Sequence, residues 1–179
     1  MKSEWKTIRA ADFMEFNPRM SLKKGTVATK ISMDKLQTYT KKIPETEQAE
    51  FSGGTKFSNG DTIMARITPC LENGKTAFVD CLNKDEVAFG STEFIVLRAK
   101  PGVSDAQFVY YLATSPEFRQ VAIKSMVGSS GRQRVQQPVL ENLELVVPEL
   151  PEQERIGEFL AAIDDKIALN AKVNDNLAA

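Results

Sequence analysis

The sequence predicts a mixed α/β (α+β) body that is followed by one long carboxyl-terminal helix. Strand patterns occupy the middle of the chain, helix-capping signals stand at Ser104 and Ser115, and apolar residues step by four and three after residue 150. These three observations give a body over residues 1–148 and a helical segment over residues 149–179.

The strand patterns are concentrated after residue 60. Residues 61–68 alternate between two faces, which is typical of a strand. Further strand candidates are residues 76–81, 93–98 and 143–147. The first sixty residues are polar and irregular, with one short edge strand expected around Ile8.

Two short helices are expected after the strands. Ser104 and Gln107 form a capping box, in which the serine accepts from the first turn and the glutamine reaches back. Ser115 with Pro116 begins the second helix, because proline is tolerated at the first position. Residues 128–134 then form a flexible polar loop, in which Gly128 and Gly131 flank two serines.

The last helix begins at Leu150-Pro151 and carries a coiled-coil-like seam. The seam residues are Ile156, Leu160, Ile163, Ile167, Asn170, Asn174 and Leu177. Either the helix docks on its own body, or it pairs with another helix. Its length of about 43 Å exceeds what a small domain usually covers, and its terminal position and seam asparagines also favour pairing.

Composition removes several classes of function. The chain has no histidine, which excludes histidine-based acid–base and nucleophilic catalysis and Cys/His zinc sites. We expect Cys70 and Cys81 to be small buried hydrophobes and the adjacent Asp164 and Asp165 to be solvated, so no metal site is predicted. The amino terminus has no apolar signal core, and no apolar run is long enough to span a bilayer, so we expect a cytoplasmic protein.

Charge is distributed unevenly along the chain. Residues 141–179 hold nine acidic and three basic residues, a net charge of −6, whereas residues 1–140 have a net charge of +5. The strongest basic excess lies in residues 118–140, which contain four basic residues and no acid. A basic stretch of this kind is either a solvated surface or a nucleic-acid contact.

Two segments combine side chains suited to DNA. Arginine can bind guanine in a bidentate manner, glutamine can do the same with adenine, and hydroxyls and freed backbone amides can hold phosphates. One segment is the loop of residues 129–136 and the other is the turn of residues 66–75, although either could be an ordinary solvent-exposed or structural loop. The candidate DNA-binding residues are Arg66, Thr68, Asn73, Lys75, Ser129, Ser130, Arg132, Gln133, Arg134 and Gln136.

Residues 145–167 resemble the specificity subunit of type I restriction–modification enzymes. The resemblance rests mainly on the Pro-x-Leu-Pro-Glu-Gln-x-x-Ile start of the long helix, at residues 148–156. Residues 60–69 and 128–134 also resemble the target-recognition domain of that family, so the resemblance covers nearly the whole chain and is strongest over residues 53–170. The resemblance implies a target-recognition domain with a twisted mixed sheet and short helices, and a coiled-coil-type helix after it. A full family member has two such domains and two helices, whereas this chain has one of each.

The resemblance also implies a function and a set of partners. The body would recognise one half of a bipartite site in double-stranded DNA, and the helix would pair with a second copy and dock methyltransferase subunits. The chain would then be non-catalytic and bind no cofactor, with S-adenosylmethionine and ATP/Mg held by methyltransferase and restriction or translocase partners. The alternative is a protein–protein adaptor with a pairing helix and no DNA binding.

Overall fold

A four-stranded antiparallel sheet lies at the centre of the structure, a computed structural model that describes residues 5–177. In sheet order its strands are β2 (Met14–Phe16), β9 (Phe94–Ala99), β6 (Thr62–Ala65) and β7 (Thr76–Phe78). Every residue of β6 is buried, because both faces of the sheet are covered. Three of the strands predicted from the sequence are thus confirmed: β6 and β7 cover half of their predicted ranges, and β9 is shifted by one residue.

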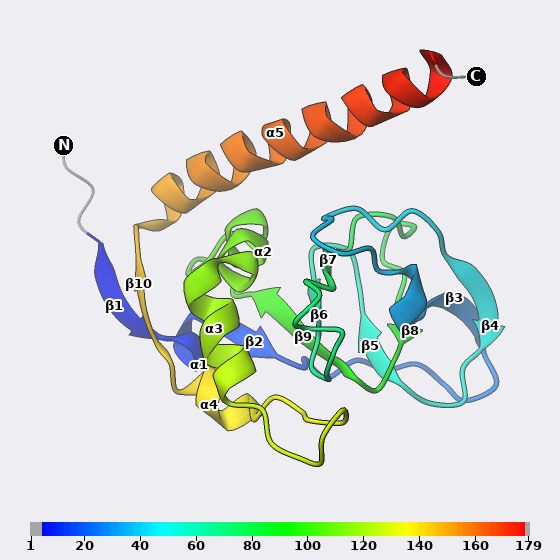
Figure 1. Ribbon diagram of the computed structural model, residues 1–179, viewed down its shortest axis with the longest axis horizontal. Helices are drawn as coiled ribbons and strands as arrows, with labels where there is room; N and C mark the ends of the chain where they lie inside the picture. Colours follow the sequence, from blue (N-terminus) through cyan, green and yellow to red (C-terminus); the bar gives the residue numbers. More distant parts are fainter. Residues whose placement is uncertain (1–4, 178–179) are drawn as a thin grey trace.

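A second sheet covers one face of the central sheet, on the right of Figure 1. In sheet order its strands are β4 (Glu47–Glu50), β3 (Val27–Ile31), β8 (Ala88–Gly90) and β5 (Thr55–Phe57). The β3–β8 pair is parallel and the other pairs are antiparallel. A shared core joins the sheets, with the Phe57 and Phe94 rings edge to face at 6.5 Å between centroids.

Helices cover the other face of the central sheet (Figure 1). They are α1 (Ala10–Phe13), α2 (Ala106–Thr114), α3 (Pro116–Lys124) and α4 (Gln137–Glu141), and a 3-10 turn, η1 (Met33–Lys35), lies between β3 and β4. Ser115 caps α3 as predicted. The predicted cap of α2 is wrong: Asp105 accepts from the Phe108 amide at 2.8 Å, whereas the Ser104 hydroxyl accepts from Lys100 N and donates to Phe13 O.

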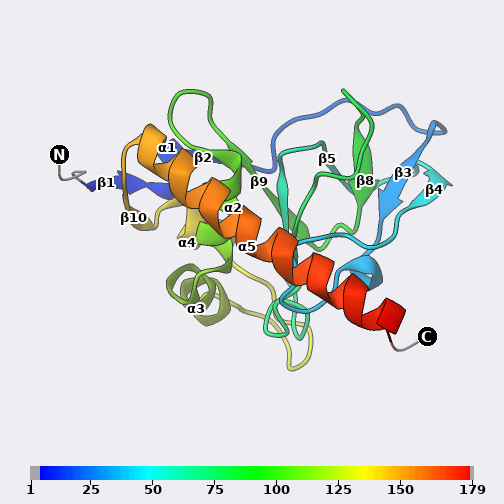
Figure 2. The ribbon, with the colours of Figure 1, turned by 90° about the horizontal axis from the view of Figure 1, so that it is seen from above.

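A two-stranded antiparallel sheet leads into the last helix. Strand β1 (Lys6–Arg9) pairs with β10 (Glu144–Val147), so the beginning of the chain lies beside the segment that precedes α5 (Leu150–Leu177). Figure 1 shows α5 running over α2 and onward toward the end of the molecule that holds the second sheet, and Figure 2 shows its far half passing beside the strands of that sheet. The expected edge strand near Ile8 and the expected long helix are both confirmed. No helix within residues 5–177 is long and apolar enough to cross a membrane.

The expectation that the first sixty residues are irregular is wrong, because five strands lie there. Strand β4 lies at the sheet edge and is mostly exposed, so its sequence has no alternation of apolar and polar residues. Strand β3 pairs with β8, which is far along the chain, so its own sequence does not indicate the pairing. The cysteine prediction also fails in part, since Cys81 is exposed and Cys70 is half-buried.

Candidate nucleic-acid interface

The turn of residues 66–75 and the loop of residues 128–136 lie against each other. Thr68 and Gln133 exchange two hydrogen bonds: Thr68 N donates to Gln133 O, and Gln133 N donates to Thr68 Oγ1, both at 3.0 Å. Arg66 also makes two hydrogen bonds to Val135: its Nη2 donates to Val135 O at 3.1 Å, and its carbonyl oxygen accepts from Val135 N at 2.9 Å. The two segments that the sequence selected separately therefore form one surface.

Residues 128–133 form a closed loop at the edge of this surface. Val127 and Arg134 exchange backbone hydrogen bonds at 3.0 and 2.8 Å, which close the loop like a short hairpin. Gly128 has a φ of +135°, and a Cβ there would meet Arg132 O at 2.9 Å, so glycine permits the close return of the backbone. Ser129, Ser130 and Arg132 are exposed at the tip, where they can reach a ligand.

A bidentate ion pair orients the guanidinium of Arg134. Its Nε and Nη2 donate to the Glu93 carboxylate at 2.6–3.0 Å, and this carboxylate holds the pKa of Arg134 above its usual value. Arg132 makes only a backbone bond, from its amide to Ser129 O, within the described part of the chain. Arg132 thus presents an exposed guanidinium, whereas Arg134 presents one already paired.

The remaining candidates divide into groups bound within the chain and groups that face solvent. The Lys75 ammonium donates to Met33 O at 2.9 Å, and the Gln136 amide donates to Arg134 O at 3.3 Å. Asn73 is exposed on the turn. Arg66 Nε is buried and has no partner among the described residues. The turn and the loop that carry the ten candidates are thus packed against each other, and the DNA contacts of these residues stay a prediction.

Two residues that were not among the sequence candidates, Arg119 and Tyr39, hold the turn of residues 66–75 in place. Arg119 donates to Leu71 O and Glu72 O, and its guanidinium stacks on the Tyr39 ring at 5.0 Å from the centroid. The Tyr39 hydroxyl also donates to Glu72 O at 3.3 Å. Arg119 belongs to the acid-free stretch of residues 118–140, so charge was a signal for it, but no local pattern indicated Tyr39.

The side of α5 that faces the body is polar at its first contact. Gln153 is fully buried; its Oε1 accepts from Asp105 N at 3.1 Å, and its Nε2 donates to Pro148 O at 2.9 Å and Val103 O at 3.2 Å. One turn later, a Cβ on Gly157 would lie 2.6 Å from Asp105 Oδ1, so the helix approaches the start of α2 closely. These contacts fasten the beginning of α5.

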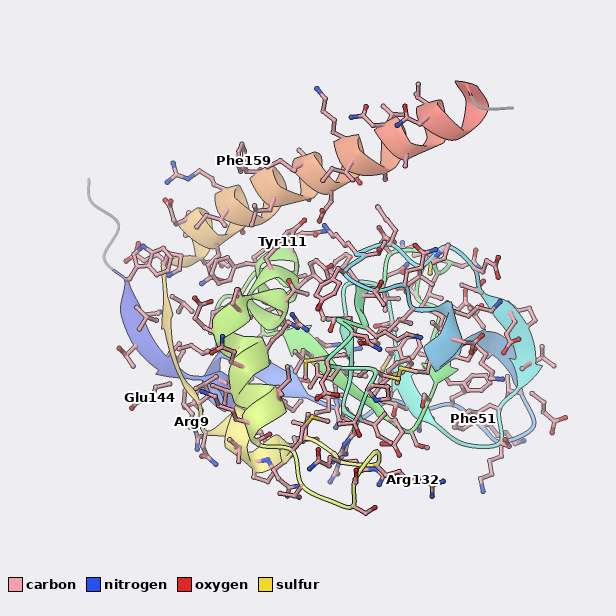
Figure 3. All side chains as sticks on the ribbon, viewed as in Figure 1. Arg9, Phe51, Tyr111, Arg132, Glu144 and Phe159 are labelled. Atoms are coloured by element: carbon pink, nitrogen blue, oxygen red, sulfur yellow. The ribbon has the colours of Figure 1, made fainter. Side chains whose placement is uncertain are left out.

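The predicted seam lies beside this docked side. Ile156 and Leu160 are half-buried against the body, whereas Ile163, Ile167, Asn170 and Asn174 are exposed, and the Leu177 side chain lies outside the described part. Phe159, which the seam prediction omitted, is 68% exposed and points away from the body (Figure 3). Helix α5 therefore docks on its own body along one side. It also leaves an exposed apolar strip, formed by Phe159, Ile163 and Ile167.

The expected solvation of the adjacent aspartates of α5 is confirmed for the exposed Asp165 and is wrong for Asp164, which is half-buried against the body. Asp164 accepts from the Tyr111 hydroxyl at 2.6 Å, and Asp165 pairs with Lys42 at 3.3 Å. No group of three or more Cys, Asp or Glu side chains suited to a metal occurs in the part of the chain that is described. A cavity of about 200 Å³ opens beside Asp164, between the helix and the body.

The loop and the exposed strip of α5 lie on opposite sides of the molecule, as Arg132 and Phe159 show in Figure 3. The molecule is therefore a compact α/β body with a basic loop at one side and a long helix fastened across the other. The family model described as "Type I restriction modification DNA specificity domain" matches residues 2–179. The chain belongs to this family.

Individual relatives agree with the family match. The EcoAI specificity subunit of Escherichia coli is 38% identical over 104 residues, which cover 58% of this chain and 18% of that protein. The EcoEI specificity subunit of the same organism is 36% identical over 108 residues, covering 60% of this chain and 18% of that protein.

Solved structures show the same fold. The HsdS subunit from Thermoanaerobacter tengcongensis matches with a TM-score of 0.70 and 19% identity over 97% of this chain and 45% of that one. The type I S subunit from M. genitalium matches with a TM-score of 0.60 and 16% identity over 96% of this chain and 42% of that one. This chain therefore spans less than half of the length of these proteins.

Proposed function

We propose that this chain is a sequence-specific DNA-recognition subunit of a type I restriction–modification system, and that its body recognises one half-site. The observation that carries the proposal is the basic loop of residues 128–136, which has an exposed tip at residues 128–132 and is hydrogen-bonded to Arg66 and Thr68 in a chain of this family. The adaptor alternative receives no support from the relatives, all of which are named as specificity subunits or domains.

The loop provides two kinds of DNA contact. The Ser129 and Ser130 hydroxyls and the amides freed by the glycines suit phosphate oxygens. The exposed guanidinium of Arg132 and the side-chain amide of the half-buried Gln133 suit base edges in the major groove. Because Arg134 is already held by Glu93, we assign it first to fixing the loop and second to attracting phosphate.

We further propose that catalysis belongs to partner subunits. In this scheme the chain docks methyltransferase subunits, which bind S-adenosylmethionine, while restriction or translocase subunits use ATP and Mg²⁺; the chain itself binds no cofactor. The exposed strip of α5 pairs antiparallel with a second copy, which joins two recognition bodies into one subunit. We place this assembly in the cytoplasm, where it meets DNA.

Salt-dependent binding to duplex DNA tests the DNA contact directly. Phosphate contacts release counterions, so the logarithm of the affinity should fall with the logarithm of the salt concentration. Arg132→Ala should weaken binding and reduce this slope by about one unit if Arg132 contacts phosphate. If it contacts a base, discrimination at that base should fall by roughly 1–3 kcal/mol.

The matched control is Arg155→Ala, which removes the same charge from exposed α5 on the other side of the molecule. It should leave affinity and slope unchanged. The double variant Arg132→Ala, Arg134→Ala should show a larger loss than Arg132→Ala alone. Unchanged affinity, slope and discrimination in the double variant would remove the loop from the interface.

A further inference from the structure

A second attachment of α5 lies eleven residues beyond Gln153 and is built from charged groups. The Lys41 ammonium donates to Tyr111 Oη at 3.0 Å, and the Tyr111 hydroxyl donates to Asp164 Oδ2 at 2.6 Å. This chain of hydrogen bonds joins three separate parts of the structure: the segment before β4, helix α2 and helix α5. Figure 3 shows Tyr111 at the top of α2, facing α5.

The cation that begins this chain is enclosed. Lys41 is 7% exposed, and its Nζ lies 4.9 Å from the Tyr111 ring centroid and 5.4 and 5.5 Å from those of Phe78 and Tyr110. A buried ammonium is costly unless it is paired and hydrogen-bonded. Tyr111 and the nearby Asp164 carboxylate provide that pairing, and undocking α5 would remove the charges of Asp164 and Asp165 and leave Asp80 as the remaining acidic group that acts on Lys41.

The neighbouring aspartate engages another group. Asp165 pairs with Lys42 at 3.3 Å, and Lys42 also pairs with Asp80 at 2.7 Å. Adjacent positions on a helix point about 100° apart, so Asp164 and Asp165 hold α5 from two directions and oppose rotation about its axis. Gln153 and Asp164 are eleven residues apart, which is about 16.5 Å along the helix axis at 1.5 Å per residue. Because α5 is attached at both of these positions, it also resists a sideways swing.

We propose that Lys41, Tyr111 and Asp164 form an orientation clamp that sets the angle at which α5 leaves the body and thereby the gap between two half-sites. This inference rests on the proposed function, in which paired helices separate two recognition bodies. The required accuracy is high: for a helix of about 42 Å, a swing of about 5° about its first turn displaces the far end by about 3.7 Å. That displacement is close to the rise of one base pair, about 3.4 Å.

The experiment measures the helix angle and the gap preference in the same variants. Spin labels are placed at Val27 on the second sheet and at Ala171 on the far part of α5, both exposed, in a full chain whose two cysteines are replaced by serine. Tyr111→Phe removes the bridging hydroxyl and keeps the ring. The matched control is Tyr110→Phe, because the Tyr110 hydroxyl makes no hydrogen bond to α5 among the described residues.

Pulsed dipolar spectroscopy should give a narrow distance distribution for the parent chain and for Tyr110→Phe, and a broader or shifted one for Tyr111→Phe. In the complex with native partners, Tyr111→Phe should lower the preference for the natural gap over gaps one base pair longer or shorter by about tenfold, the scale of one lost hydrogen bond to a charged group. Affinity for an isolated half-site should stay unchanged, which a general loss of structure would not allow.

The clamp is overturned if Tyr111→Phe keeps both the narrow distribution and the gap preference, or if Tyr110→Phe broadens the distribution equally. Asp164→Asn, which keeps the shape of the side chain and removes its charge, provides a second test and should also broaden the distribution. If the parent chain binds no duplex DNA, the proposed function fails, while the distance measurement still decides whether the clamp fixes the helix.

Discussion

Arg134 and Arg132 are two residues apart in one basic loop, yet they differ in what they can do. The composition of residues 129–136 was enough to select both, and the glycines were enough to predict that the loop is exposed. The pairing of Arg134 with Glu93 could not be predicted, because Glu93 lies 41 residues away and reaches the loop only through the central sheet. Sequence identified the candidate region, and tertiary contacts divided its residues into supporting and free groups.

Lys41 provides a prediction at the scale of one residue. Burial lowers the pKa of Lys41 below its usual 10.5, against the opposing effect of Asp164. Between the lowered value and 10.5 the unfolded chain binds more protons at this site than the folded one, so this residue's contribution to stability rises with pH in that window. In urea denaturation, the free energy of unfolding of the parent chain minus that of Lys41→Met should therefore increase as the pH approaches 10.5. A flat or falling difference would contradict it.

Gly157 provides a second prediction. Alanine in a helix interior is ordinarily more stabilising than glycine by roughly 0.5–1 kcal/mol. Here the added Cβ would lie 2.6 Å from Asp105 Oδ1 and 2.9 Å from Gln107 Cβ, so Gly157→Ala should instead destabilise the chain by about 1–3 kcal/mol. Chemical denaturation measures the sign directly. A stabilised variant would mean that α5 does not approach α2 this closely.

At the scale of elements, long regular patterns were predictable and short exposed strands were not. The extent of α5 and the central strands followed from periodicity, because each buries a defined side. Strands β3 and β4 were missed because their stability comes from pairing with distant segments rather than from their own pattern. The cap of α2 failed for a similar reason, since the core already binds the Ser104 hydroxyl.

The exposed strip of α5 predicts self-association. Ile163 and Ile167 are 43% and 61% exposed, so Ile163→Asp changes a side chain that the body only partly covers. In a helix pair the new carboxylate would be buried without a partner, and the pair should dissociate. Light scattering should give a dimer mass for the parent chain and a monomer mass for the variant. Ala162→Asp, with the same charge outside the seam, should remain dimeric; a monomeric parent chain at high micromolar concentration contradicts the prediction.

At the scale of the whole molecule, the basic loop and the exposed strip of α5 lie on opposite sides of one body (Figures 1 and 3). In the proposed pair, two copies joined through α5 would carry two recognition surfaces at a separation that the helix sets. Inserting one heptad after Ala168, beyond the clamp, should lengthen each helix by about 10.5 Å, or about three base pairs at 3.4 Å each. The preferred gap should increase while the half-site bases stay the same, as methylation of a library of gapped sites would measure.

Mapping the methylated site of the complex between this chain and its native methyltransferase partners tests the central claim most directly. Two-fold symmetry in the protein pair predicts an interrupted palindrome, with half-sites on the order of one duplex turn, roughly 34–36 Å, apart. Two unrelated half-sites would contradict the self-paired form and indicate a different recognition body as partner. A continuous, ungapped site, or a methylation pattern unchanged when this chain is omitted, would contradict the account as a whole.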